Sequence, residues 1–416
     1  MIGYLRAHAA CNVEPSMRTT SLAAVLLFAA CHGDPVDPGV DAAPPDPDAA
    51  TDAAAPVDAP AAACDVSGLA TVPTVPVTTA LIRPSDTARG GETIDDVVQM
   101  QLKRHVVSAP TNAADRNGQL FVWMPGSGGE PGNFETIVGV GTAAGYLTVS
   151  LAYDNETSVG DRCGVPNDPV CGDANPDCEE DVREEMVYGS AVHDSPCVDV
   201  TPANALEHRI LRLVQYLAQS VPQSGAGAFL TAGGAALDWS KIAVGGWSQG
   251  GGHAGILARD HLVARAVYAS KGAGSTLCPL TVGDPAMCDL DGDGRLTPGN
   301  LDELLVPVPW AGQPRMTPGS RQFAAIHGLE DAWHYSRETF ELYGMGAKGT
   351  EIDLDVAGGD YAAYTCRHTF VTRATPACGP TDYHKSMATD ACLARTPGGT
   401  PVLAPFYWYA LKLPVP

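Results

Sequence analysis

An α/β fold with a mostly parallel central sheet flanked by helices is the class that this sequence predicts. Short apolar runs alternate with segments of helical periodicity, as in parallel strands joined by helical crossovers. Residues 241–255, KIAVGGWSQGGGHAG, give the sharpest example, with an apolar run, a glycine-flanked turn and a helix-like continuation. The 416 residues, 45% of them hydrophobic, suffice for one large core.

Three parts follow one another along the chain. Residues 1–31 fit a secretory signal, because the apolar run 22–30 follows Met17-Arg18. Its end, Phe28-Ala29-Ala30-Cys31, resembles the lipobox of bacterial lipoproteins, although Phe28 replaces the usual leucine; an ordinary cleaved signal is the alternative. Residues 32–63, rich in Ala, Pro and Asp, cannot build a core and are expected to form a disordered tether. Residues 64–416 form the folded domain.

Charge and cysteine content restrict the partners and the compartment. The formal net charge of -23 argues against binding to nucleic acid or to anionic membrane surfaces. Twelve cysteines without paired C-x-x-C spacing indicate disulfides rather than zinc, and therefore an oxidising compartment. We expect a secreted, cell-surface or periplasmic protein, anchored to the membrane only through a lipid on Cys31.

Predicted elements before the serine turn follow in order. Residues 103–108 and 119–124 have the β-branched and aromatic content of strands, and a helix over 134–144 precedes a buried strand over 146–153. The irregular stretch 161–200 holds four cysteines and is expected to be a disulfide-stapled lid insertion. An amphipathic helix over 203–221 then leads to the strand before the turn, with apolar residues at Leu206, Ile210, Leu213, Val214 and Leu217.

The turn itself reads Gly246-Trp247-Ser248-Gln249-Gly250. This G-x-S-x-G spacing resembles the nucleophile elbow of the α/β-hydrolases, in which a serine on a sharp strand-to-helix turn tolerates only small residues two positions away. The resemblance implies an oxyanion loop upstream, and then an acid and a histidine downstream. The glycine-rich turn 125–131 suits the loop, with backbone N–H groups from Gln249 and from Ser127 or Gly128 binding the oxyanion; a plain surface turn is the alternative.

A broader resemblance covers roughly residues 120–411. The segments REEMVYG (183–189) and WSQGGGHA (247–254), with the helix between them, resemble a family of largely uncharacterised bacterial α/β-hydrolases. The family's H-x-S-x-x-x-D pattern is carried by His384, Ser386 and Asp390. The resemblance implies an α/β-hydrolase fold and a serine hydrolase activity.

The acid and the base each have two candidates. Strands over 264–270 and 321–328 precede Glu330 and Asp331; Asp331 is the expected acid and Glu330 the alternative, unless they only begin the helix over 333–343. A last strand is expected over 351–356. His384 is preferred as base over His368, because His368 adjoins a strand-like run that Cys366 and Cys378 could staple. His253, five residues after the serine, is expected to serve packing.

The insertion over 278–310 contains a calcium-loop pattern. Asp289, Asp291 and Asp293 occupy positions 1, 3 and 5, glycine occupies position 6, and Arg295 offers its carbonyl oxygen. Asn300 replaces the usual glutamate at position 12. We expect a weak structural calcium site; an acidic surface turn is the alternative.

Together these features predict a secreted carboxylic-ester hydrolase with a Ser248–His384–Asp331 triad and no organic cofactor. Its substrate would be a small-molecule or polymeric ester. The rival hypothesis is a catalytically silent lipoprotein that uses the scaffold for calcium-dependent surface binding or adhesion. Acyl transfer to an acceptor other than water would use the same residues.

Overall fold

The computed structural model describes residues 65–98, 101–164, 168–172, 175–277 and 305–415. The expected signal, the tether and the predicted calcium loop lie outside these residues. The chain divides into the units Met1–Ala59 and Pro60–Pro416, and the description below concerns the second.

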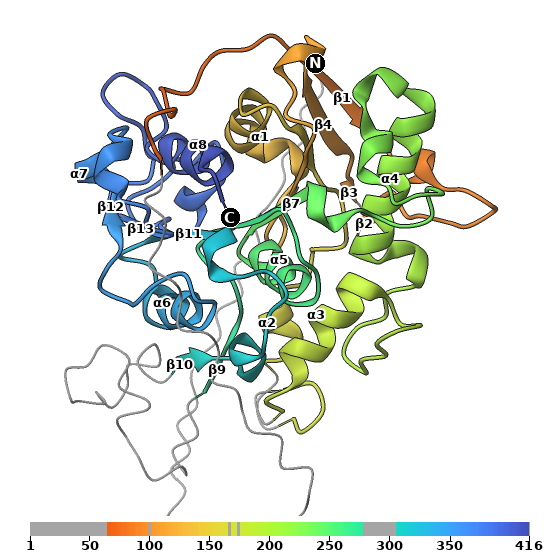
Figure 1. Ribbon diagram of the computed structural model, residues 1–416. Helices are drawn as coiled ribbons and strands as arrows, with labels where there is room; N and C mark the ends of the chain where they lie inside the picture. The colour runs from red at the N-terminus through yellow and green to blue at the C-terminus, as the bar shows by residue number, and fades with distance from the viewer. Residues whose placement is uncertain (1–64, 99–100, 165–167, 173–174, 278–304, 416) are drawn as a thin grey trace, which may run out of the picture. The chain divides into compact units, whose positions relative to one another are not determined.

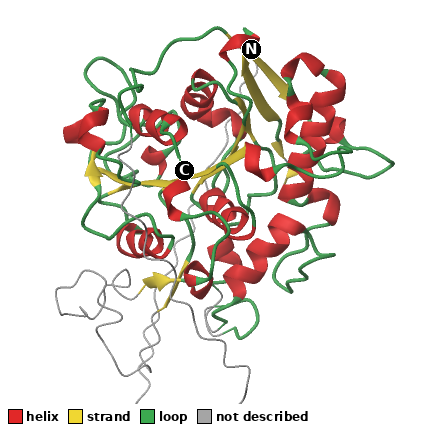
Figure 2. Ribbon diagram, viewed as in Figure 1, coloured by secondary structure: helices red, strands yellow, loops and turns green. Residues whose placement is uncertain are grey.

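A nine-stranded sheet forms the centre of the domain (Figure 2). β4 is antiparallel to both of its neighbours, β1 and β6, and the other adjacent pairs in the sheet are parallel. The carboxyl ends of the parallel strands therefore meet at one edge. In spatial order the strands are β1 (Val77–Ile82), β4 (His105–Pro110), β6 (Leu147–Ser150), β5 (Leu120–Met124), β7 (Ile242–Trp247), β8 (Arg265–Ala269), β11 (Gln322–His327), β13 (Thr369–Thr372) and β12 (Ile352–Asp353).

Helices cover both faces of this sheet (Figure 1). Two short ladders lie outside it, β2 (Val97–Val98) with β3 (Gln101–Leu102) and β9 (Ser275–Leu277) with β10 (Leu305–Pro307). The α-helices are α1 (Glu135–Ala143), α2 (Val159–Arg162), α3 (Cys178–Tyr188), α4 (Leu206–Ser220), α5 (Gln249–Asp260), α6 (Trp333–Leu342), α7 (Leu354–Ala357) and α8 (Ala404–Lys412).

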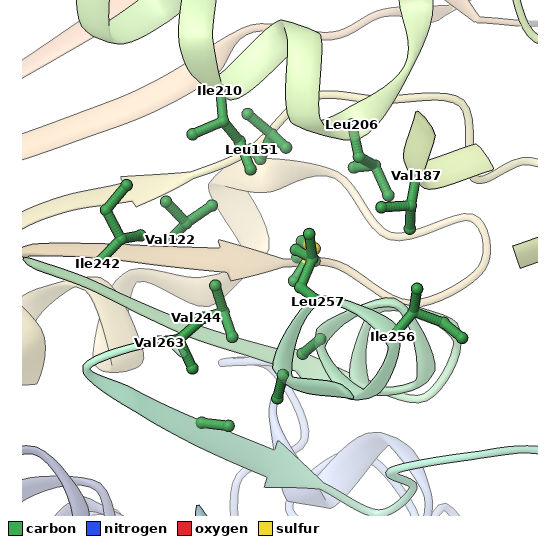
Figure 3. Packing of buried hydrophobic residues seen from close by; sticks show 14 of the residues in the cluster. Val122, Leu151, Val187, Leu206, Ile210, Ile242, Val244, Ile256, Leu257 and Val263 are labelled. Atoms are coloured by element: carbon green, nitrogen blue, oxygen red, sulfur yellow. The ribbon is translucent and has the colours of Figure 1, made fainter. Parts of the chain in front are cut away.

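Two apolar clusters, one on each face, hold the sheet in place. Along β5, Val122 joins the cluster with α3, α4, α5 and α6, whereas its neighbours Phe121 and Trp123 join the cluster with α1 and α8. This alternation follows from the two-residue period of a strand. Figure 3 shows the first cluster, with Ile210 of α4 and Leu257 of α5 among the side chains packed around β5 and β7. The central strand β7 is therefore buried on both faces.

Most predicted elements are present, but parts of the fold differ from the prediction. The segment 351–356 contributes only the two residues of β12 before α7 begins, and the run after His368 forms β13 instead. The insertion 161–200 contains the helix α3. The helix α8 was not predicted, because residues 406–411 are all buried and show no polar face.

Disulfides are found in the insertion over 161–200 and in the segment after β13. Cys163–Cys178 and Cys171–Cys197 join the insertion over 161–200, as predicted. The third, Cys378–Cys392, corrects the suggested pairing of Cys378 with Cys366. The segment that carries His384 is thus closed at its base.

Candidate active site

Ser248 occupies a strained turn between β7 and α5. Its backbone angles, φ 56° and ψ -119°, lie in a region that residues other than glycine rarely adopt. The chain passes so closely that a Cβ on Gly246 would lie 2.2 Å from the carbonyl carbon of Gly250, and one on Gly250 would lie 2.0 Å from Met124 O. Two glycines are therefore required, and the Ser248 side chain sits at the carboxyl edge of the sheet.

The glycine-rich turn after β5 lies against this serine. A Cβ on Gly126 would be 2.9 Å from the Cβ of Ser248. Ser127 Oγ donates to Gln249 Oε1 at 2.7 Å, which joins the turn to the first residue of α5. The Gly128 N–H donates to the Asn155 carbonyl at 2.7 Å, so Gly128 cannot be the expected oxyanion donor. Within the described ranges, the N–H groups of Ser127 and Gln249 have no protein acceptor.

Asn155, which the sequence did not single out, braces the turn from behind. It is 1% exposed, and its side-chain amide donates to the carbonyl oxygens of Gly126 and, at 3.0 Å, of Gly129. Its Oδ1 accepts from Lys103, whose ammonium also pairs with Glu156 at 2.8 Å. The only signal in the sequence is a polar residue soon after a buried strand. This network fixes the backbone that would meet an oxyanion.

His384 pairs with Glu330, which was the alternative acid, and not with Asp331. The distance from His384 Nδ1 to Glu330 Oε1 is 2.5 Å, and Ser270 Oγ donates to the other carboxylate oxygen at 2.8 Å. The Glu330 N–H donates to the His327 carbonyl and closes a turn at this point. In this turn Glu330 is buried and Asp331 is exposed. The expectation for Asp331 fails because adjacent residues of this turn face opposite ways.

Trp247 connects His384 to the elbow. The rings of Trp247 and His384 lie 4.9 Å apart, and Trp247 Nε1 donates to the His384 carbonyl at 2.8 Å. His384 is therefore held against the residue that directly precedes Ser248.

His368 lies at the other edge of the sheet. Its Nδ1 contacts the carbonyl of Gln322, the first residue of β11, at 2.8 Å, and its ring stacks on Phe323. Because β7 and β11 run in the same direction, the start of β11 is opposite to Ser248. His368 is therefore not brought to the site.

His253 lies within α5 and is fully buried. Neither ring nitrogen has a hydrogen-bond partner among the residues that the structure describes, and the ring packs edge-on against Tyr153. Burial, with the nearby Arg183 charge, holds the pKa of His253 well below its usual value. This neutral, packed ring fits the expectation that His253 serves packing.

Two cavities flank the serine turn and share Ser127. One of about 320 Å³ is lined by Ser248 and Gln249 and by parts of α2 and α3, so the stapled insertion forms its wall. The other, of about 510 Å³, is lined by Trp247, Lys385 and Cys392. Ser248 itself lines the first cavity and not the second.

The described part of the chain contains no group of three or more His, Cys, Asp or Glu side chains suited to a metal ion. The calcium prediction on Asp289, Asp291, Asp293 and Arg295 falls outside it. Within the same ranges, every helix is too short or too polar to cross a membrane.

Comparison with solved structures finds several esterases at low similarity. Carboxyl esterase 2 from the mycorrhizal fungus Tuber melanosporum has 12% identity and a TM-score of 0.35, over 83% of this chain and 89% of that chain. Esterase B from Lactobacillus rhamnosis has 11% identity and a TM-score of 0.32, over 72% and 75%. A mutant of esterase rPPE has 12% identity and a TM-score of 0.32, over 83% and 85%. No family model and no curated protein matches the sequence.

Proposed function

We propose that the protein is a serine hydrolase of the α/β-hydrolase type that cleaves carboxylic esters. The observation that carries the proposal is the buried Glu330 carboxylate held against His384, whose ring contacts Trp247, the residue before a serine on a strained strand-to-helix turn. The order along the chain, serine, then acid, then histidine, is the one that the elbow pattern implies.

In this proposal each residue has a definite role. Ser248 Oγ attacks the ester carbonyl while Nε2 of His384 accepts its proton, and Glu330 stabilises the imidazolium through Nδ1. The N–H groups of Ser127 and Gln249 bind the oxyanion of the tetrahedral intermediate. The imidazolium then protonates the leaving alcohol, and water attacks the acyl-enzyme by the same route in reverse.

A fluorophosphonate probe tests the proposal directly, because it reacts with an activated serine. We expect an adduct on Ser248, and Ser248→Ala is expected to lose both the adduct and about 10⁶-fold in turnover of p-nitrophenyl butyrate. If the folded protein takes up no probe and hydrolyses no ester, the proposal is overturned in favour of the silent binding lipoprotein.

The setting of the enzyme is a further part of the proposal. A secretory signal, a lipid on Cys31 and a tether over 32–63 would hold the domain outside the cytoplasm. The disulfides of the domain support an oxidising compartment. Mass spectrometry of the N-terminal peptide from membrane fractions would identify a lipidated Cys31 or an unmodified, cleaved N-terminus.

A further inference from the structure

The cavity of about 320 Å³ beside Ser248 has charged walls. Arg183 and Glu179 of α3 line it, as does Lys271, which follows β8. A cavity built for a long acyl chain would be lined by apolar side chains, because burying charge against hydrocarbon is costly. The charged side chains therefore indicate that the cavity binds a polar or charged group and not a long hydrocarbon chain.

Arg183 is held at the first turn of α5. It is 4% exposed, its Nη1 donates to the Gln249 carbonyl at 3.2 Å, and its Nη2 pairs with Glu179 at 3.3 Å. Its Nε has no hydrogen-bond partner among the described residues. Gly252 leaves room for this approach, since a Cβ there would lie 2.2 Å from Nη1. A guanidinium at the positive end of a helix is unfavourable by itself and is favourable beside an anion.

Lys271 adds a second cation to the same cavity. Its ammonium lies 5.2 Å from the centre of the Tyr335 ring. Burial alone would lower the pKa of Lys271, but the Tyr335 hydroxyl and the carboxylates of Glu330 and Glu179 outweigh it and hold the pKa above its usual value. The lysine is therefore charged at neutral pH.

The three charges leave an excess of one positive charge in the cavity. Arg183 and Lys271 are the cations among these lining side chains and Glu179 is the anion, while the Glu330 carboxylate near Lys271 does not line the cavity. A carboxylate bound there would pair with Lys271 and Arg183 in a place of reduced dielectric, where ion pairs are strong. A neutral hydrocarbon of the same size would only remove water from these groups.

We infer that this cavity binds an anionic group of the substrate, so that the preferred substrates are small esters that carry a carboxylate near the scissile bond. The inference rests on the proposed function. The carboxylate could belong to the acyl part, as in the half-ester of a dicarboxylic acid, or to the alcohol part, as in the ester of a hydroxy acid.

Two matched pairs of esters distinguish a carboxylate on the acyl part from one on the alcohol part. For the acyl side, p-nitrophenyl hydrogen adipate is compared with p-nitrophenyl hexanoate, with spontaneous hydrolysis subtracted. For the alcohol side, 4-acetoxybenzoate is compared with 4-acetoxybenzamide. We expect kcat/KM to be about tenfold to a hundredfold higher for the charged member of one pair than for its neutral partner, as for a hydrogen-bonded charge pair. Added salt should bring this charged-to-neutral ratio toward unity, because it screens the charges.

Single substitutions test which residue causes the preference for the charged ester. Lys271→Met is expected to reduce the charged-to-neutral ratio about tenfold or more while hydrolysis of the neutral ester continues. Lys241→Met is the matched control, because it removes the same charge from an exposed residue before β7, at the far edge of the sheet, and should leave the ratio unchanged. Free adipate should inhibit the wild type competitively and Lys271→Met much more weakly.

The outcomes that would overturn the inference are distinct from failure of the proposed function. If both neutral esters are hydrolysed faster than their charged partners, the proposed hydrolase function is retained and the inference that the cavity binds a carboxylate is wrong. If the charged preference survives in both Lys271→Met and Arg183→Met, with melting temperatures close to wild type, the carboxylate binds elsewhere. Absence of all hydrolysis, with no fluorophosphonate adduct, removes the proposed function itself.

Discussion

The Glu330 carboxylate joins two strand ends, since one oxygen receives the Ser270 hydroxyl at 2.8 Å and the other faces His384 Nδ1 at 2.5 Å. Ser270 directly follows β8, and its backbone φ of 69° is another strained angle beside the site. Two neighbouring strands thus fix the carboxylate that orients the histidine.

Glu330→Gln is expected to lower kcat about 10²–10⁴-fold, because an amide neither fixes the tautomer nor stabilises the imidazolium. Asp331→Asn is the adjacent control and should stay near wild type, since Asp331 is exposed. Steady-state hydrolysis of p-nitrophenyl butyrate measures both. A large loss only in Asp331→Asn would restore the original assignment.

His384→Ala is expected to abolish ester hydrolysis, whereas His368→Ala should retain substantial activity. The reason is topological, because His368 lies at the start of β11 and β13, away from Ser248. Loss of its contact with Gln322 should lower the melting temperature instead. Comparable turnover by His384→Ala and wild type would remove His384 as base.

Asn155→Ala is expected to lower kcat about tenfold to a hundredfold with a smaller change in KM, because the turn that carries Ser127 loses its support. The melting temperature should also fall, since buried carbonyl oxygens lose their donor. Asn112→Ala is a suitable control, because Asn112 is exposed and caps the short turn at Ala113–Asp115 on the far edge. Equal kinetic losses in the two variants would contradict the bracing role.

Acid should destabilise the domain through its buried histidines. Burial lowers the pKa of His105 to about 3, and holds that of His253 well below 6.5. Between these values and 6.5 the unfolded chain binds protons that the folded chain does not, so stability falls as pH drops below 6.5. Replacing one such histidine, as in His253→Met, should flatten the slope by up to about 1.4 kcal/mol per pH unit. Urea unfolding from pH 7 to 4.5 measures it, and an unchanged slope would contradict it.

Millimolar calcium is expected to raise the melting temperature, and a chelator to lower it, through the loop of Asp289, Asp291 and Asp293. Binding in the roughly 10⁻⁴–10⁻³ M range suits an extracellular loop without the position-12 glutamate. Asp291→Ala should remove the response without changing ester hydrolysis. If calcium does not change the melting temperature of the wild type, the loop is an acidic surface turn and not a calcium site.

Local patterns in the sequence were enough for the elbow but not for its partners. Gly246 is required by its contact with the backbone of Gly250, four residues later, so local spacing indicates the turn, whereas Gly250 is required by the backbone of Met124, which is distant in sequence. Glu330 and Asp331 are neighbours, and only the turn on His327 decides which one faces the histidine. Asn155 acts through three-dimensional contacts with the glycine-rich turn after β5, and no motif marks such a residue.

The parts of the fold that were missed have a similar cause. The helix α8 is buried along most of its length, so its sequence lacks the polar face by which an amphipathic helix is recognised. The alternation over 351–356 predicted a strand, but after β12 the Asp353 side chain caps α7 and the chain turns into a helix. Pairing partners in a sheet depend on contacts distant in sequence, which such periodicity does not contain.

The last helix also affects the order in which the molecule can be assembled. The Tyr407 hydroxyl of α8 donates to the Met387 carbonyl at 2.6 Å, three residues after His384, and Asp390 accepts the N–H of Thr136 at the start of α1. The histidine segment is thus held between one of the first helices and the last. The proposed base, His384, is therefore positioned only after α8 has docked, in a late folding step dominated by long-range contacts, and activity should appear only at that step.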